Sequence, residues 1–195
     1  MGEIRSAKEI IAERLKEVGE ITEEDRLRWK FVPAGEKLGH RYLTERLDLE
    51  TELGTFDKKQ LPFVKKGITQ ALLLNIDLPR NQTVEKRNGK VMDGLMQVKE
   101  DKESAAGALG ELQRIFDHYL QKSEAQQAQA KQALKNKFEQ SIRQALKAQG
   151  KEFSGQMNVE QSPQFQEEWR RTLTQLELQY VKTMDEIKKY LSQVE

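Results

Sequence analysis

The chain has 195 residues, and its 33 Lys and Arg side chains almost balance 32 Asp and Glu, leaving a formal net charge of +1 at pH 7. This balance gives no overall attraction to nucleic acid or to an acidic membrane surface. The absence of cysteine excludes disulfides, thiolate metal sites and a cysteine nucleophile. Hydrophobic residues make up 36% of the chain and charged residues 33%, a balance typical of long helices with narrow apolar faces.

Helix signals begin close to the N-terminus. Ser6 and Glu9 form a capping-box pattern ahead of a helix expected over residues 7–18. A second, shorter helix is expected to begin after Thr22. Because proline disfavours the helical conformation of the residue before it, we expect the chain to bend at Pro33 and to resume as a helix over residues 38–54.

The expected bend lies inside a stretch rich in aromatic residues. Gly35 and Gly39 sit where a bulky side chain would keep two helices apart. We therefore predict a structural joint, in which an aromatic cluster locks one helix against the next. The joint consists of Trp29, Phe31, Pro33, Leu38 and Tyr42.

A metal site at this joint is the alternative. Glu36 and His40 are four residues apart, so on a helix they share a face and would supply two ligands. No third ligand is identifiable, and we expect an ion pair or a hydrogen-bonded histidine instead. His118 beside Asp117 is expected to be ordinary helix surface.

The most apolar segment of the chain follows, and a helix over residues 62–76 is expected there, beginning with Pro62 in its first turn. Residues 77–81 should end it, because Pro79 follows directly. We place a domain boundary here, between an N-terminal helical cluster over residues 1–80 and a long helical hairpin over residues 81–195.

Two apolar seams with coiled-coil spacing run through this second part. Asn88 and Lys102 interrupt the first seam, and polar residues at such positions can fix the register of a partner helix. The first seam consists of Val84, Val91, Leu95, Val98, Leu109, Leu112, Phe116 and Tyr119. The second consists of Trp169, Leu173, Leu176, Tyr180, Met184, Ile187 and Leu191.

The pattern leaves open whether residues 82–149 form one unbroken helix. Gly89, Gly94, Gly107 and Gly110 lie along it, and each costs about 1 kcal/mol relative to alanine inside a helix. A single helix would form the spine of the molecule.

The C-terminal helix should fold back on residues 115–149. Ser162 and Pro163 predict its start, as N-cap and first-turn proline, after a loop over residues 150–162. Residues 131–151 carry a net charge of +5 and residues 160–195 a net charge of −2. Opposite charges would face each other across an antiparallel hairpin, so the expected fold is all-α, with an elongated, coiled-coil-like hairpin or bundle.

Motifs for catalysis are missing. The stretch Gly35–Gly39 lacks the spacing of a phosphate-binding loop, and no dinucleotide fingerprint, nucleophile elbow or zinc-protease motif occurs. We therefore expect no enzyme activity, no cofactor and no metal.

Nucleic-acid binding is the alternative function. The cations are Arg80, Lys86, Arg87 and Lys90, together with the basic stretch 131–151. Single-strand binding usually adds aromatic residues for stacking, and neither stretch interleaves aromatics with its charges.

The opening Glu3–Ile10 and the block Trp29–Leu38 (WKFVPAGEKL) resemble the start of an uncharacterised group of small bacterial helical proteins. The resemblance covers residues 1–50. It implies a bacterial, cytoplasmic context and assigns no activity or binding residue.

Taken together, the two seams predict a structural or protein-interaction protein. We expect it to self-associate as a homo-oligomer or to bind another helical protein, because its apolar residues are too few to close a globular core. No stretch is long and apolar enough to span a membrane, and a cytoplasmic location is expected.

Overall fold

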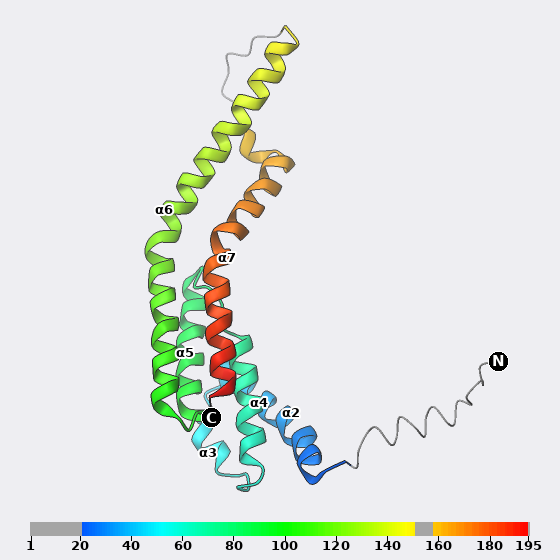
Figure 1. Cartoon of the computed structure of the whole chain (residues 1–195), viewed down its shortest axis with the longest axis vertical. Helices are drawn as coiled ribbons and strands as arrows, with labels where there is room; N and C mark the ends of the chain where they lie inside the picture. Colours follow the sequence, from blue (N-terminus) through cyan, green and yellow to red (C-terminus); the bar gives the residue numbers. More distant parts are fainter. Residues whose placement is uncertain (1–20, 151–157, 195) are drawn as a thin grey trace, which may run out of the picture. The chain divides into compact units, whose positions relative to one another are not determined.

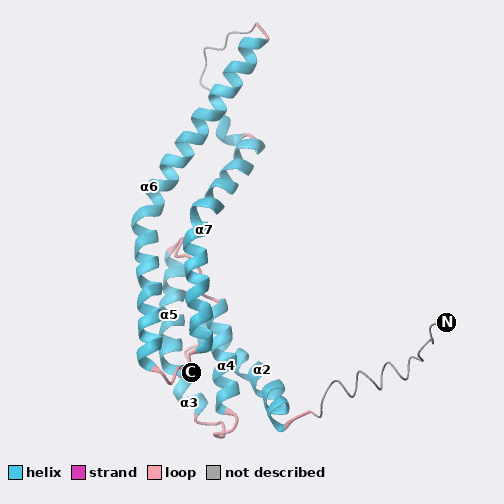
Figure 2. Cartoon of the chain, in the orientation of Figure 1, coloured by secondary structure: helices cyan, strands magenta, loops and turns pink. Residues whose placement is uncertain are grey.

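The computed structural model describes residues 21–150 and 158–194, and every regular element within these ranges is helical (Figure 2). The predicted all-α fold is confirmed. The helix expected over residues 7–18 lies outside the described residues. Contacts divide the chain into two compact units, Met1–Leu74 and Asn75–Glu195. The sequence put its boundary at residue 80, and whether these units are independent domains stays a prediction.

Unit 1 contains α2 (Glu23–Thr44), the short α3 (Leu49–Leu53) and α4 (Leu61–Leu74). Helix α2 starts with a capping box, in which Thr22 accepts from the amide of Asp25 and the Asp25 carboxylate accepts from the amide of Thr22. Acidic residues fill the first turn of α2 and complement its dipole.

Helices α2 and α4 pack at very short range because glycines lie at their contact. A Cβ atom on Gly35 would lie 2.1 Å from the carbonyl oxygen of Val64, and one on Gly67 would lie 2.0 Å from that of Val32. Only a residue without a side chain permits this approach. The prediction that Gly35 lies at a close contact between two helices is confirmed, but the facing helix is α4 and not a helix across a bend at Pro33.

The predicted bend at Pro33 is wrong, because α2 runs through Pro33 without a break. The proline is exposed, and its neighbour Val32 turns its carbonyl toward Gly67 of α4. Packing of one continuous apolar face against α4 thus outweighs the unfavourable effect of an internal proline, which is about 3 kcal/mol.

The residues predicted to form a structural joint between two helices all lie on the single helix α2. Phe31, Leu38 and Tyr42 are buried on the same face of α2, whereas Trp29 is 62% exposed. Phe31 also meets Phe56 edge to face, with ring centroids 6.2 Å apart. These residues form the packing face of one helix rather than a corner between two.

Unit 2 contains α5 (Gln82–Val98), α6 (Lys102–Ala148), the 3₁₀ turn η1 (Val159–Gln161) and α7 (Pro163–Gln193). Helices α6 and α7 lie side by side and antiparallel, as the sequence predicted (Figure 1). Ser162 caps α7 through the amide of Phe165, with Pro163 in the first turn. Gly150, with a positive φ of 70°, follows the end of α6.

Residues 82–149 do not form a single helix, because α5 ends at Val98 and α6 begins at Lys102. The Asp101 side chain caps the first turn of α6, and the Lys102 ammonium donates to the carbonyls of Met96 and Gln97 at the end of α5. Helix α5 consequently packs against α6 instead of extending it. The predicted long hairpin therefore consists of α6 and α7, with α5 packed against α6 as a third helix.

Candidate functional site: a polar clasp and an open groove on the hairpin

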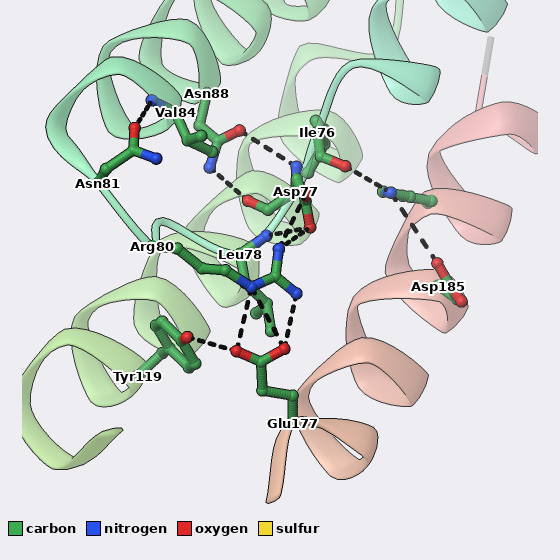
Figure 3. Close-up of polar contacts among 11 residues, drawn as sticks. Ile76, Asp77, Leu78, Arg80, Asn81, Val84, Asn88, Tyr119, Glu177 and Asp185 are labelled. Atoms are coloured by element: carbon green, nitrogen blue, oxygen red, sulfur yellow. Dashed lines mark hydrogen bonds and ion pairs between the residues drawn. The ribbon is translucent and has the colours of Figure 1, made fainter. Parts of the chain in front are cut away.

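A cluster of polar side chains fastens the segment before α5 to the hairpin (Figure 3). Arg80 donates from Nε and Nη2 to the Glu177 carboxylate at 3.0 and 2.7 Å, and from Nη1 to Asp77 at 3.1 Å. The Tyr119 hydroxyl donates to Glu177 at 2.6 Å. We call Asp77, Arg80, Tyr119 and Glu177 the polar clasp.

The pKa values of the clasp follow from these contacts. Burial alone would raise the pKa of Glu177, but hydrogen bonds from Arg80 and Tyr119 outweigh it and hold that pKa below its ordinary value of 4.5. Burial and the bond to Glu177 raise the pKa of Tyr119. At neutral pH Glu177 is thus a carboxylate and Tyr119 a neutral phenol.

The backbone around the clasp is held by further bonds. Asn88, which the sequence placed on the first seam, accepts from the amide of Asp77 at 3.3 Å and donates to its carbonyl at 2.6 Å. Lys188 of α7 donates to the carbonyl of Ile76 at 2.7 Å (Figure 3). Because Ile76 and Leu78 are also buried, the segment over residues 76–80 belongs firmly to unit 2.

The contacts of the clasp favour a structural role, which is to hold the segment before α5, α6 and α7 together. Both oxygens of Glu177 accept charge-assisted bonds, so the carboxylate has little basicity left for proton abstraction. Among the described residues no group of three His, Cys, Asp or Glu side chains is placed to hold a metal ion.

An open groove runs along one face of the hairpin between α6 and α7. Its larger hollow, of about 910 Å³, extends from Glu111 to Ala130 on α6 and from Gln175 to Thr183 on α7. A second hollow, of about 460 Å³, shares Glu111 and continues to Ser104 on α6 and Tyr190 on α7. We call this continuous surface the α6–α7 groove.

The groove combines an apolar floor with polar walls, which include the charged residues Glu111, Arg114 and Glu186. The floor includes Ile115, Leu176 and Ile187, which are half-buried, and Tyr190 is 49% exposed at one end. A Cβ atom on Gly107 would meet no atom within 4 Å, so the surface there is free. Such a surface accepts side chains from another helix more readily than a small polar substrate.

One polar contact crosses the groove. His118 Nδ1 lies 2.9 Å from the Tyr180 hydroxyl, and Tyr180 also meets Tyr119 edge to face at 5.3 Å. These contacts fix the side chains in the middle of the groove wall. The sequence reading of His118 as ordinary helix surface missed this contact.

The predicted seams are buried to different degrees. In the first seam all residues except Val84 are buried. In the second seam only Met184 and Leu191 are buried, while Trp169, Leu173, Leu176, Tyr180 and Ile187 are half-buried. The first seam is therefore covered within the chain, except at Val84, whereas part of the α7 seam stays accessible.

Two basic residues of α6 pair with one acidic residue just before α7, as expected from the opposite charges of the two segments. Glu160 of η1 accepts from Lys131 at 2.7 Å and lies 3.4 Å from Lys135. Phe138 packs edge to face on Phe165 at 5.4 Å nearby. Arg80, one of the cations considered for nucleic acid, is likewise engaged, in the clasp.

The candidate metal pair does not converge on a site. His40 is exposed on α2 and Glu36 is half-buried. Arg80 and Glu177 were not singled out as partners from the sequence. The register of α6 against α7 was readable in principle, because the pairs Tyr119 with Tyr180 and Phe138 with Phe165 lie almost symmetrically about residue 150 of the sequence.

These features define an all-α protein with an open groove on a helical hairpin. Residues 50–193 match the model of the family of unknown function DUF6657, and the chain belongs to that family. No curated protein and no solved structure matches the chain. The predicted membership of an uncharacterised helical group is confirmed, but the matching region is 50–193 and not residues 1–50.

None of the described helices is both long and apolar enough to cross a membrane.

Proposed function

We propose that this protein is a non-enzymatic interaction protein of the cytoplasm, which binds another protein helix against helix through the α6–α7 groove. The observation that carries the proposal is the groove itself, where half-buried apolar residues of α7 face open space beside α6. Covering such a face by another helix removes apolar surface from water, which is the main driving force of association.

The clasp supports this role by keeping the groove walls in place. It ties α6, α7 and the segment before α5 to one carboxylate, Glu177, whose side chain is only 15% exposed. A preformed surface binds at lower entropic cost than one that must be ordered on binding.

Nucleic-acid binding has less support. Arg80, Lys131 and Lys135 are engaged with acidic side chains of the chain itself. Phosphate binding draws its affinity from cations that release counterions, and engaged cations contribute less. This alternative stays a prediction for which no contact of the described residues argues.

Position-specific photo-crosslinking in cells that express the chain tests the proposal. Benzoylphenylalanine replaces either Gln179, which lines the groove, or Gln113, which is exposed on α6 outside it. We expect a discrete crosslinked product from position 179 and none from position 113. No product from either position, or the same products from both, would contradict a role for the groove.

A further inference from the structure

The α6–α7 groove is long enough to be an interface between large helical surfaces. From Ser104 to Ala130 it follows α6 for about 39 Å at 1.5 Å per residue. With two helices each about 10 Å wide, the face measures about 800 Å², which is the area that each partner contributes to a stable interface of standard size.

The chain itself supplies helices that fit this length. Among the described helices, α6 with 47 residues and α7 with 31 residues are longer than the groove, whereas α5 with 17 and α4 with 14 residues are shorter. The groove is formed by these same two long helices. Two copies placed groove to groove would therefore cover each other along the full length, in a closed two-fold arrangement.

We propose that the occupant of the groove is the groove of a second copy, so that two hairpins form an antiparallel four-helix bundle. This inference rests on the proposed function and names its partner. In this bundle α6 packs on α6 of the second copy and α7 on α7. Gly107 and Ala108 on the groove face permit a close approach of the facing α6 helix.

Charge decides the orientation of the two copies. Glu111 and Glu186 line the same end of the groove. A parallel two-fold pairing would set α6 against α7 of the second copy and bring these two acids together, which is unfavourable. The antiparallel pairing, centred on the groove, instead places the two acids of one copy at the opposite end of the groove from those of the other copy.

The first test is the mass of the purified full-length chain by light scattering as a function of concentration. We expect a mass twice the 22.6 kDa of one chain. A monomer at all concentrations up to the millimolar range would overturn the inference.

Two matched glycine variants assign the dimer to the groove. Gly107→Leu places a bulky side chain on the groove face, while Gly110→Leu places the same side chain on α6 outside the groove. Both positions are open in the single chain, and leucine favours helix. We expect Gly107→Leu to weaken dimerisation about ten-fold or more, through overpacking between facing helices. Equal effects of the two variants would overturn the assignment to this face.

Spin labels then measure the orientation. The chain contains no cysteine, so single cysteines at Gln113 and Gln132, both exposed on α6, are the only labelling sites in each variant. In the antiparallel dimer the distance between equivalent labels grows by about 3 Å for each residue away from the two-fold axis, twice the helical rise. Similar distances at both positions would indicate the parallel pairing and overturn the proposed one.

The two proposals fail differently. A monomeric chain whose position 179 crosslinks to a product other than twice the chain mass would overturn the second-copy inference and leave the proposed function standing. A dimer that forms through the groove must also give a product of twice the chain mass from position 179, so the absence of any product there would count against both proposals.

Discussion

At the scale of single residues, Glu177 connects three parts of unit 2. Its carboxylate accepts from Arg80 and Tyr119, which come from two different elements of unit 2. Replacing one member of such a network leaves the others with unpaired polar groups, and this costs more than the net gain of the bond itself. Glu177 is therefore the residue at which the hairpin should be most sensitive to pH and to substitution.

We expect Glu177→Gln to lower the free energy of unfolding at pH 7 by about 2 kcal/mol, the usual worth of hydrogen bonds to a charged group. The pKa of Glu177 is depressed in the folded chain, so its contribution is complete above the ordinary value of 4.5 and is lost as the pH falls through the folded pKa. Denaturant unfolding at pH 7 and at stepwise lower pH measures the difference between wild type and variant.

The difference should shrink as the pH falls below 4.5, because the protonated wild-type side chain then resembles glutamine in charge. Glu124→Gln, at an exposed position of α6, is the matched control and should leave the stability unchanged within about 0.5 kcal/mol. A difference between Glu177→Gln and wild type that stays constant down to pH 2 would contradict the electrostatic account.

At the scale of helices, glycines play opposite roles in the two units. In unit 1, Gly35 and Gly67 make room for the backbone of the facing helix. In unit 2, Gly89 and Gly107 lie on helices with open space above them. Glycine inside a helix is unfavourable on its own, so only the first pair is compensated by packing within the chain.

We expect Gly35→Ala and Gly67→Ala to lower the free energy of unfolding by about 1–3 kcal/mol or more, because each added methyl group would overlap a carbonyl of the facing helix. Gly89→Ala is the control of opposite sign and should raise it by about 0.5–1 kcal/mol. Thermal and denaturant unfolding followed by circular dichroism compares the three variants. Stabilisation by all of them would show that α2 and α4 are not in close contact.

The helix boundaries also show which parts of the fold could be predicted from the sequence. The start of α7 and the capping box of α2 were readable, because Ser162 with Pro163 and Thr22 with Asp25 act through bonds within one turn. Pro33 was misread, since its cost is offset by packing against a helix distant in sequence. Helix propensities and the effect of proline on its neighbours depend on nearby residues only, so they do not include packing against a helix distant in sequence.

The sequence left open whether residues 82–149 form one helix, and the position of the break between α5 and α6 was not predicted, for a related reason. Glycines were taken as the weak points of a long helix, yet Gly89, Gly94 and Gly107 all lie inside helices. The helices part instead at Asp101, where a side-chain cap and the Lys102 ammonium replace backbone bonds. The groove could not be read from the sequence, because half-burial of α7 depends on which face α6 covers.

At the scale of the whole molecule, the region that matches the family begins at a different residue from the boundary between unit 1 and unit 2. The match begins at residue 50, inside α3, whereas the contacts divide the chain after Leu74. Helix α4 thus lies within the matched region while its packing partner α2 lies outside it. A fragment cut at residue 50 keeps α4 and loses the helix against which Gly67 and Ala71 are packed.

We therefore expect fragments to separate these two boundaries. Residues 75–195 retain the clasp, the bonds of Asn88 and Lys188 and both long helices, so this fragment should stay helical and unfold cooperatively. Residues 50–195 should expose the apolar face of α4, bind a hydrophobic dye and aggregate at lower concentration. Circular dichroism, dye binding and light scattering of both fragments beside the full chain measure this. Loss of helix in residues 75–195, with residues 50–195 well folded, would instead make α4 part of the core of unit 2 and the family boundary the true limit of the folding unit.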